Sequence, residues 1–168
     1  DFGYLKKTIN PLNFYALSKA TVDYWVLDNM DRFEQVQGFR YFNVYGEGEE
    51  HKGDQASPIS KFTKQSKETK VIKIFEESEY AFRDFVWVED VVDVVLDNTA
   101  GSGIYDVGTG NPISFLEIAE LIAKKEGAEI EVIPFPKHLE GKYQEYTCAD
   151  TSWYSHNYSE VSHYLHTK

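Results

Sequence analysis

This sequence has a single cysteine and no long apolar run. The first absence excludes an intrachain disulfide, and the second excludes a membrane-spanning helix. Cys148 is the single cysteine among 168 residues, so an intrachain disulfide is excluded and a reducing compartment is expected. No segment approaches the roughly 18 consecutive apolar residues of a membrane-spanning helix. The polar start of the chain does not resemble a secretory signal. We therefore expect a cytoplasmic protein that does not enter a membrane.

Positive charge is also scarce. The chain carries 17 Lys and Arg against 28 Asp and Glu, which gives a net charge of −11. That balance disfavours a surface built to bind nucleic acid or an anionic membrane, so an anionic ligand must be held by a local cluster of donors. The five histidines are scattered, and no set of Cys and His has the spacing of zinc ligands. We therefore expect no metal site.

A glycine-rich phosphate loop is a third feature that the sequence lacks. The GTG at Gly108 to Gly110 is missing the third glycine of a dinucleotide fingerprint, and it is better interpreted as a tight turn between a strand and a helix. What the sequence does have is 42% hydrophobic and 15% aromatic residues. A chain of this length and composition is able to bury a core.

The periodicity of apolar residues predicts strands and helices in alternation, which indicates an α/β fold. Strands are expected at 36–45, 71–75, 84–88, 104–107 and 129–133. Helices are expected at 14–30, with one buried face, and at 58–67 and 89–98. A fourth helix is predicted from a capping box of Ser114 and Glu117 to its end at Gly127. The segment after Thr151 has no clear period, so no element is predicted there.

Tyr15 and Lys19 are the first candidate catalytic pair. They are four residues apart, so on a helix they share one face, where the lysine ammonium favours the ionised phenol. Such a tyrosine exchanges a proton with a substrate hydroxyl. By itself the pair is weak support, because tyrosine and lysine are frequent enough in this chain for one such pair to arise by chance.

Two further cations stand at predicted element ends. Lys52 lies in the charged segment Glu47 to Ser57, which follows a predicted strand, and open α/β sheets bind ligands at that end of their strands. The alternative is a solvated lysine among acidic neighbours. Arg83 precedes a predicted strand, where its planar guanidinium is suited to a diphosphate. The alternative there is a surface ion pair with Asp84.

Seven segments, taken in order, closely resemble the extended short-chain dehydrogenases of the NAD-dependent epimerase/dehydratase family. RYFNVYG and RDFVxVEDV are shared by many of these enzymes, whereas the HKG loop and GKYQ point to the branch that epimerises an ADP-activated heptose. The resemblance covers nearly everything from Asn10 to Asp150. The segments are NPLNFYALSK (10–19), GFRYFNVYG (38–46), EEHKGDQAS (49–57), FEESE (75–79), FRDFVWVEDV (82–91), YDVGTG (105–110) and GKYQEYTCAD (141–150).

The resemblance implies an α/β fold with a partial Rossmann-type doubly wound sheet and a small α/β substrate-binding domain. Residues 1–50 correspond to the C-terminal part of the Rossmann-type NADP-binding domain. Residues 51–168 correspond mainly to the substrate-binding domain, with the segment at about 80–110 returning to the Rossmann sheet. The sequence thus matches the C-terminal half of such an enzyme, and we expect these 168 residues alone to be inactive.

The resemblance also assigns roles to single residues. Tyr15 and Lys52 correspond to two catalytic acid/bases, and Lys19 to the lysine that contacts the cofactor ribose. Val44 and Lys52 correspond to cofactor contacts. Asp54 stands where the family has a serine and Lys61 where it has a histidine. The substrate-binding positions implied in this way are Asn43, Asp54, Lys61, Phe75, Glu76, Glu77, Ser78, Arg83 and Tyr143.

The implied reaction inverts C6 of ADP-D-glycero-D-manno-heptose through transient oxidation by NADP to a ketone. NAD is the alternative cofactor. The enzyme is expected to be a cytoplasmic homo-oligomer that supplies a precursor of the lipopolysaccharide inner core. Alternatives are a UDP-sugar 4-epimerase, a dTDP-glucose dehydratase, or a catalytically inactive fragment that serves as a binding module.

Overall fold

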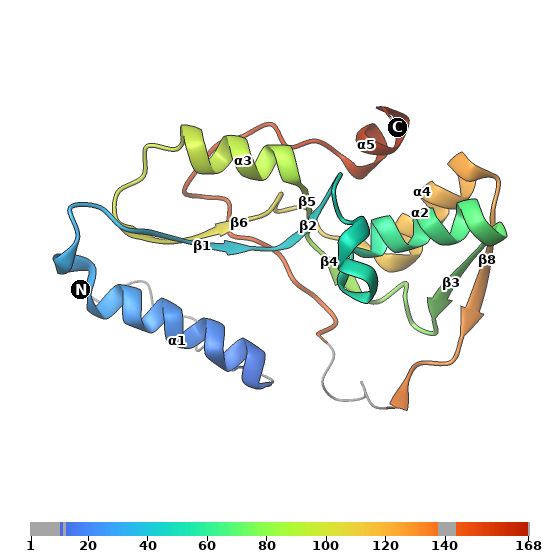
Figure 1. Cartoon of the computed structure of the whole chain (residues 1–168), viewed down its shortest axis with the longest axis horizontal. Helices are drawn as coiled ribbons and strands as arrows, with labels where there is room; N and C mark the ends of the chain where they lie inside the picture. The colour runs from blue at the N-terminus through green and yellow to red at the C-terminus, as the bar shows by residue number, and fades with distance from the viewer. Residues whose placement is uncertain (1–10, 12, 138–143, 168) are drawn as a thin grey trace. The chain divides into compact units, whose positions relative to one another are not determined.

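The computed structural model describes residues 11, 13–137 and 144–167 of the chain (Figure 1). The chain divides into two compact units. One unit comprises residues up to 38 together with 101–104, and the other comprises 39–100 and 105–168. Among the described residues, no helix combines the length and the apolar character needed to cross a membrane.

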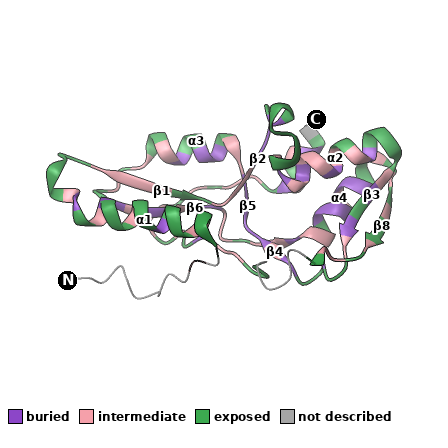
Figure 2. Cartoon of the chain, turned by 60° about the horizontal axis from the view of Figure 1, so that its bottom comes forward, coloured by how far each residue is buried: buried purple, intermediate pink, exposed green. Residues whose placement is uncertain are grey.

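Helix α1 (Phe14–Asp28) dominates the first unit and is followed by the short 3₁₀ helix η2 (Met30–Arg32). It begins at Asn13, whose side-chain oxygen accepts a hydrogen bond from the backbone N–H of Ala16 at 2.8 Å. The predicted helix is confirmed, but its predicted buried face is wrong. Only Ala20 and Val26 are buried, and most of α1 is exposed in Figure 2.

The physical reason lies in the distribution of apolar residues around α1. They surround the helix instead of forming one stripe, so no single packing surface could bury them all. Leu17, Val22 and Trp25 therefore stay 48%, 57% and 52% exposed.

Among the residues that the structure describes, the strands pair two by two. β2 runs parallel to β5, β3 runs parallel to β8, β4 runs antiparallel to β7, and β1 pairs with β6. The strand predicted at 36–45 is two strands, because Phe42 lies between β1 and β2. The strand bounds are β1 Gln37–Tyr41, β2 Asn43–Tyr45, β3 Val71–Phe75, β4 Phe82–Arg83, β5 Phe85–Trp87, β6 Gly103–Val107, β7 Ile113–Ser114 and β8 Glu129–Ile133.

The larger core of the second unit lies where α2 (Pro58–Thr69) and α4 (Phe115–Glu126) meet the pair β3 and β8. Its apolar side chains include Ile59, Ile72, Ile118 and Ile122, each at most 1% exposed. α4 has the predicted capping box and ends at Gly127 in the left-handed conformation, so local sequence signals for this helix are confirmed.

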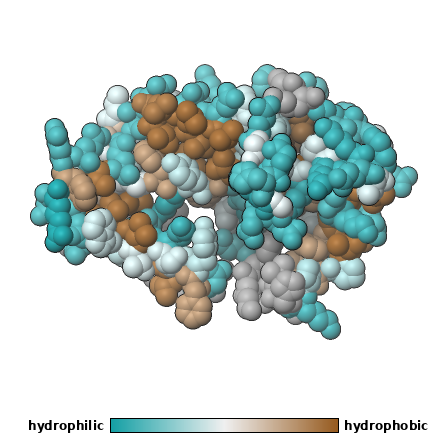
Figure 3. All heavy atoms as spheres, viewed as in Figure 1, coloured by the Kyte–Doolittle hydropathy of each residue, from teal (hydrophilic) through white to brown (hydrophobic). Residues whose placement is uncertain are grey.

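A second, smaller core lies between α3 (Val88–Asp97) and the strands β2, β5 and β6. Val91 and Val94 are its buried residues on α3. The outward side of the same helix keeps Val92 and Leu96 47% and 74% exposed, and Figure 3 shows apolar surface in that region.

The C-terminal segment ends in α5 (Val161–Thr167), which the sequence did not predict. Val161 and Leu165 of α5 belong to the larger core. The α/β fold class is confirmed, with parallel strand pairs joined through helices. The assignment of 1–50 and 51–168 to a cofactor and a substrate domain stays a prediction.

Candidate active site

Tyr15 and Lys19 share one face of α1, as the sequence predicted. The Nζ atom of Lys19 lies 5.2 Å from the centroid of the Tyr15 ring, within the range of a cation–π contact. Tyr15 is 72% exposed, so its hydroxyl is accessible within the described part of the chain. The catalytic roles of both residues stay predictions.

Lys52 lies in the 3₁₀ helix η3 (Glu50–Gln55), within the segment that sequence patterning assigned to a loop. Its Nζ atom is 3.3 Å from the Oε1 atom of Glu49, and its side chain is 41% exposed. Gly53 has a φ of 53° and no neighbouring atoms where a Cβ would stand, so glycine is needed there for backbone conformation and not for space. The loop thus presents a half-exposed ammonium at a fixed place.

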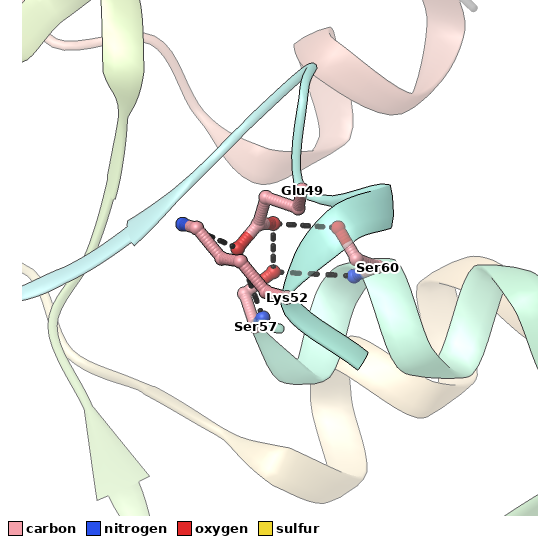
Figure 4. Close-up of polar contacts among 4 residues, drawn as sticks. All are labelled: Glu49, Lys52, Ser57 and Ser60. Atoms are coloured by element: carbon pink, nitrogen blue, oxygen red, sulfur yellow. Dashed lines mark hydrogen bonds and ion pairs between the residues drawn. The ribbon is translucent and has the colours of Figure 1, made fainter. Parts of the chain in front are cut away.

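Glu49 is the residue that fixes this loop (Figure 4). It is only 6% exposed. Its carboxylate accepts hydrogen bonds from the Ser57 N–H at 3.0 Å, the Ser57 hydroxyl at 2.6 Å and the Ser60 hydroxyl at 2.5 Å. The alternative of a solvated lysine among acidic neighbours is met in part, because the Lys52 side chain is 41% exposed and pairs with Glu49. Glu49 itself is buried and bound to four donors.

Two opposing effects act on the Glu49 carboxyl. Burial by itself raises its pKa, because it disfavours the charged form. Hydrogen bonds from Ser57 and Ser60 and from the Lys52 ammonium outweigh burial and hold the pKa of Glu49 below its usual value. Glu49 is thus an ionised anchor, and Lys52 is the cation that it orients.

Arg83 is buried, at 8% exposure, so its alternative as a surface ion pair is wrong. Its guanidinium donates to the backbone carbonyl of Phe82 at 2.7 Å and to that of Gln144, and it lies 5.6 Å from the ring centroid of Phe115. These contacts hold the segment after residue 143 beside β4. Tyr143 itself lies outside the described residues.

The predicted substrate residues that follow β3 surround the start of α4. Ser78 is buried, and its hydroxyl donates to the carbonyl of Phe75 at 2.6 Å. The N–H of Leu116 in α4 donates to the carbonyl of Ser78 at 3.4 Å. Glu76 and Glu77 are exposed in the turn between them. The structure therefore brings this turn and Arg83 to the first turn of one helix.

Four other predicted contacts lie elsewhere in the second unit. The N–H of Asn43 donates to the carbonyl of Asp84 at 2.9 Å, and Val44 packs against the smaller core. Asp54 is exposed in η3, and Lys61 is half-buried on α2. Their roles in binding substrate or cofactor stay predictions.

Asp84 is a structural residue that sequence reasoning did not single out. It is fully buried, and its carboxylate accepts from the Thr109 N–H and hydroxyl at 2.7 Å each and from the N–H groups of Gly110 and Ala149 at 2.9 Å each. A Cβ at Gly108 would lie 2.7 Å from Asp84 Oδ2. The GTG turn is thus shaped around a buried carboxylate, and the need of its backbone N–H groups for an acceptor is the signal that could have indicated one.

A family profile and two of the most similar relatives agree on one protein family. Residues 4–108 match the profile of the "NAD dependent epimerase/dehydratase family". The ADP-L-glycero-D-manno-heptose-6-epimerases of Alkalilimnicola ehrlichii and Brachyspira hyodysenteriae are each 45% identical to this chain over 152 residues. The alignments cover 84% and 86% of this chain and 48% of each relative.

Solved structures agree with the sequence matches. The crystal structure of Helicobacter pylori ADP-L-glycero-D-manno-heptose-6-epimerase superimposes with a TM-score of 0.68 and 32% sequence identity. The match covers 78% of this chain and 42% of that one. The chain therefore spans about half the length of the relatives that it matches.

Proposed function

Because this chain belongs to the NAD dependent epimerase/dehydratase family, we propose that it supplies the acid/base and substrate-binding residues of an epimerase that inverts C6 of ADP-heptose. The observation that carries the proposal is the 45% identity over 152 residues to two ADP-L-glycero-D-manno-heptose-6-epimerases. We place this activity in the cytoplasm, in the synthesis of a lipopolysaccharide precursor, and in a homo-oligomer.

The family name implies a nicotinamide cofactor, and we propose NADP, with NAD as the alternative. When bound, such a cofactor supplies reversible hydride transfer, which allows inversion at a carbon whose proton is not acidic. An exposed ammonium at Lys19 and a neighbouring hydroxyl at Tyr15 are suitable donors for the ribose end of a nucleotide. Val44 is the proposed apolar contact. These residues fit one end of the cofactor, while the phosphate end needs a glycine-rich turn that the 168 residues do not contain.

Two groups of this chain are proposed to move protons. Tyr15 accepts the proton of the C6 hydroxyl as the ketone forms, and Lys52 donates a proton to the C6 oxygen as the inverted centre is made. Glu49 supports the second role, because a buried carboxylate 3.3 Å from the ammonium restricts where Lys52 points. Two separate proton carriers suit a reaction in which the C6 oxygen is retained and its proton leaves and returns from different directions.

Arg83 and the turn that contains Ser78 are proposed to form the nucleotide-sugar subsite. Two of the guanidinium's bonds go to backbone carbonyls. We therefore propose that Arg83 acts partly as a positioning residue, which holds the segment after Tyr143 in place. Its burial, at 8% exposure, fits this positioning role.

A chimera tests the proposed function directly. The N-terminal half of the Helicobacter pylori enzyme is joined upstream of this chain, and the product is incubated with NADP and ADP-D-glycero-D-manno-heptose. Chromatographic separation of the two epimers should show conversion in the parent and a loss on the order of 10²-fold with Lys52→Met. Lys64→Met on exposed α2 surface is the matched control and should leave the rate unchanged.

Each failure of this experiment has a distinct meaning. Conversion of UDP-glucose instead of the heptose would favour a 4-epimerase, since a one-base 4-epimerase needs no lysine at position 52. A folded chimera that binds NADP but converts neither sugar would favour a binding module. The 168 residues alone should show no micromolar NADP binding by calorimetry, because the phosphate-binding turn is not among them.

A further inference from the structure

A carboxylate and imidazole cluster lies where the C-terminal segment crosses α3. Asp90 and Asp93 are one helical turn apart on α3, and His156 comes from the segment that follows Asp150. The ligand atoms of these three side chains all lie within 4.8 Å of one another. Asp90 and His156 are separated by 66 positions, so no spacing pattern in the sequence could reveal the group.

The distances suit a small divalent cation. Two ligand atoms on a tetrahedral ion with bonds of about 2.0 Å are about 3.3 Å apart. The Nε2 atom of His156 is 3.2 Å from the Oδ1 atom of Asp90. The same 3.2 Å contact is a hydrogen bond in the structure, so a bound ion would take the place of the proton between the two atoms. The exposed Asp93 side chain can rotate to complete a third ligand. One imidazole and two carboxylates leave a fourth position for water, as in zinc sites that have three protein ligands.

Aromatic neighbours fix the orientation of the His156 ring. The His156 ring packs edge-on against Tyr158 with centroids 4.8 Å apart and lies beside Tyr154 at 6.3 Å. Its side chain is only 18% exposed. These contacts fix the ring plane and aim Nε2 at Asp90, which reduces the entropy lost when an ion binds.

The negative charge of Asp90 also favours a bound cation. Asp90 is 5% exposed, and within the described residues the His156 imidazole is the one basic side chain recorded in contact with its carboxylate. Ser159 donates to it through its N–H at 2.8 Å. Asp93 adds a second carboxylate, with its ligand atom within 4.8 Å of those of Asp90 and His156.

We propose that Asp90, Asp93 and His156 bind one divalent cation of the zinc type. The ion fastens the C-terminal segment to α3. Residues 151–158 of that segment, with Thr109 and Asn111, line a cavity of about 540 Å³, so the ion also sets the shape of this cavity. Nothing in the proposed epimerase reaction requires this site, and the inference stands without that proposal.

Calorimetry on the chain after treatment with a chelator tests the site. Titration with ZnCl2 should show saturable binding of one equivalent, and MgCl2 should bind at least tenfold more weakly, because magnesium prefers oxygen ligands to imidazole. Asp93→Asn should weaken zinc binding tenfold or more, as should His156→Gln. His51→Gln, a change of an exposed histidine in η3, is the control and should have no effect.

Asp93→Asn keeps the test decisive even if His156→Gln fails to fold, because the Asp93 side chain is exposed. Zinc should raise the thermal midpoint of the parent and not that of Asp93→Asn. The site is refuted if zinc binds without saturation, or if both variants bind zinc as the parent does. Equal affinity for magnesium would remove His156 from the ligands and refute the zinc-type assignment.

Discussion

Helices α1 and α4 are both capped at their first turn, yet they differ in what covers them. α4 buries Ile118, Ala119 and Ile122 completely. α1 buries only Ala20 and Val26 of its 15 residues. Capping therefore starts a helix in both places, and tertiary packing decides which of them contributes to stability. The exposed surface of α1 carries the candidate catalytic pair. We therefore expect substitutions on α1 to affect activity and substitutions on α4 to affect stability.

The largest effect is expected in α4. Ile118→Ala should lower the free energy of unfolding by about 2–5 kcal/mol, since it opens a cavity at a fully buried position. Leu17→Ala on α1 removes a comparable side chain that is 48% exposed, and it should cost less than about 1 kcal/mol. Urea unfolding of both variants measures the difference. Equal losses would mean that α1 is as well packed in solution as α4.

Enzymatic activity, unlike stability, should depend on the exposed face of α1. In the chimera, Tyr15→Phe should lower kcat on the order of 10²-fold, because only the transferable proton is removed. The unfolding free energy should change by less than about 0.5 kcal/mol, since Tyr15 is 72% exposed. Tyr24→Phe, on the same helix, is the control for both measurements. A kcat within a factor of two of the parent would remove Tyr15 from the mechanism.

A smaller effect is expected at the anchor of Lys52. Glu49→Gln should lower the unfolding free energy by about 1–3 kcal/mol near pH 7, because the charged acceptor of three hydroxyl and N–H donors is lost. The pKa of Glu49 is lowered in the folded state, so its contribution is present above its usual pKa of 4.5 and is lost as the pH falls further, through the folded-state pKa.

Urea unfolding at neutral and at acidic pH checks this sign. The difference between the parent and Glu49→Gln should shrink as the pH falls, whereas Glu50→Gln, at an exposed neighbour, should match the parent at both values. A difference that grows on acidification would contradict the ionised anchor.

Local signals explain why much of the second unit was predictable. The capping box of Ser114 and Glu117 and the C-terminal Gly127 all belong to one helix, and β3 and β8 have the predicted bounds. α5 was missed because it is defined by distant contacts. Its Tyr164 ring packs 5.2 Å from Tyr45 and 6.1 Å from Trp87, and no short-range pattern contains these pairs.

Sequence patterns identified candidate residues of the site but not the distant contacts that hold them. The positions of Tyr15, Lys19 and Lys52 followed from spacing and from resemblance to a family. The burial of Glu49 did not, because it depends on serines 8 and 11 residues away that face back toward the loop. The contacts of Arg83 with Gln144 and Phe115 were likewise not predictable, because both partners are distant in the sequence.

The smallest effect on the free energy of unfolding is expected from an exposed apolar residue of α1. It tests whether α1, unlike α4, is uncovered in solution. Val22 is 57% exposed, and glutamine has a better helix propensity than a β-branched residue. Val22→Gln should therefore change the unfolding free energy by no more than about 0.5 kcal/mol, with the sign toward greater stability. Unfolding is measured at two protein concentrations, and the parent and variant should agree at both. A loss above about 1 kcal/mol that appears only at the higher concentration would show that another surface covers this side of α1 in solution, because association stabilises the folded state by mass action.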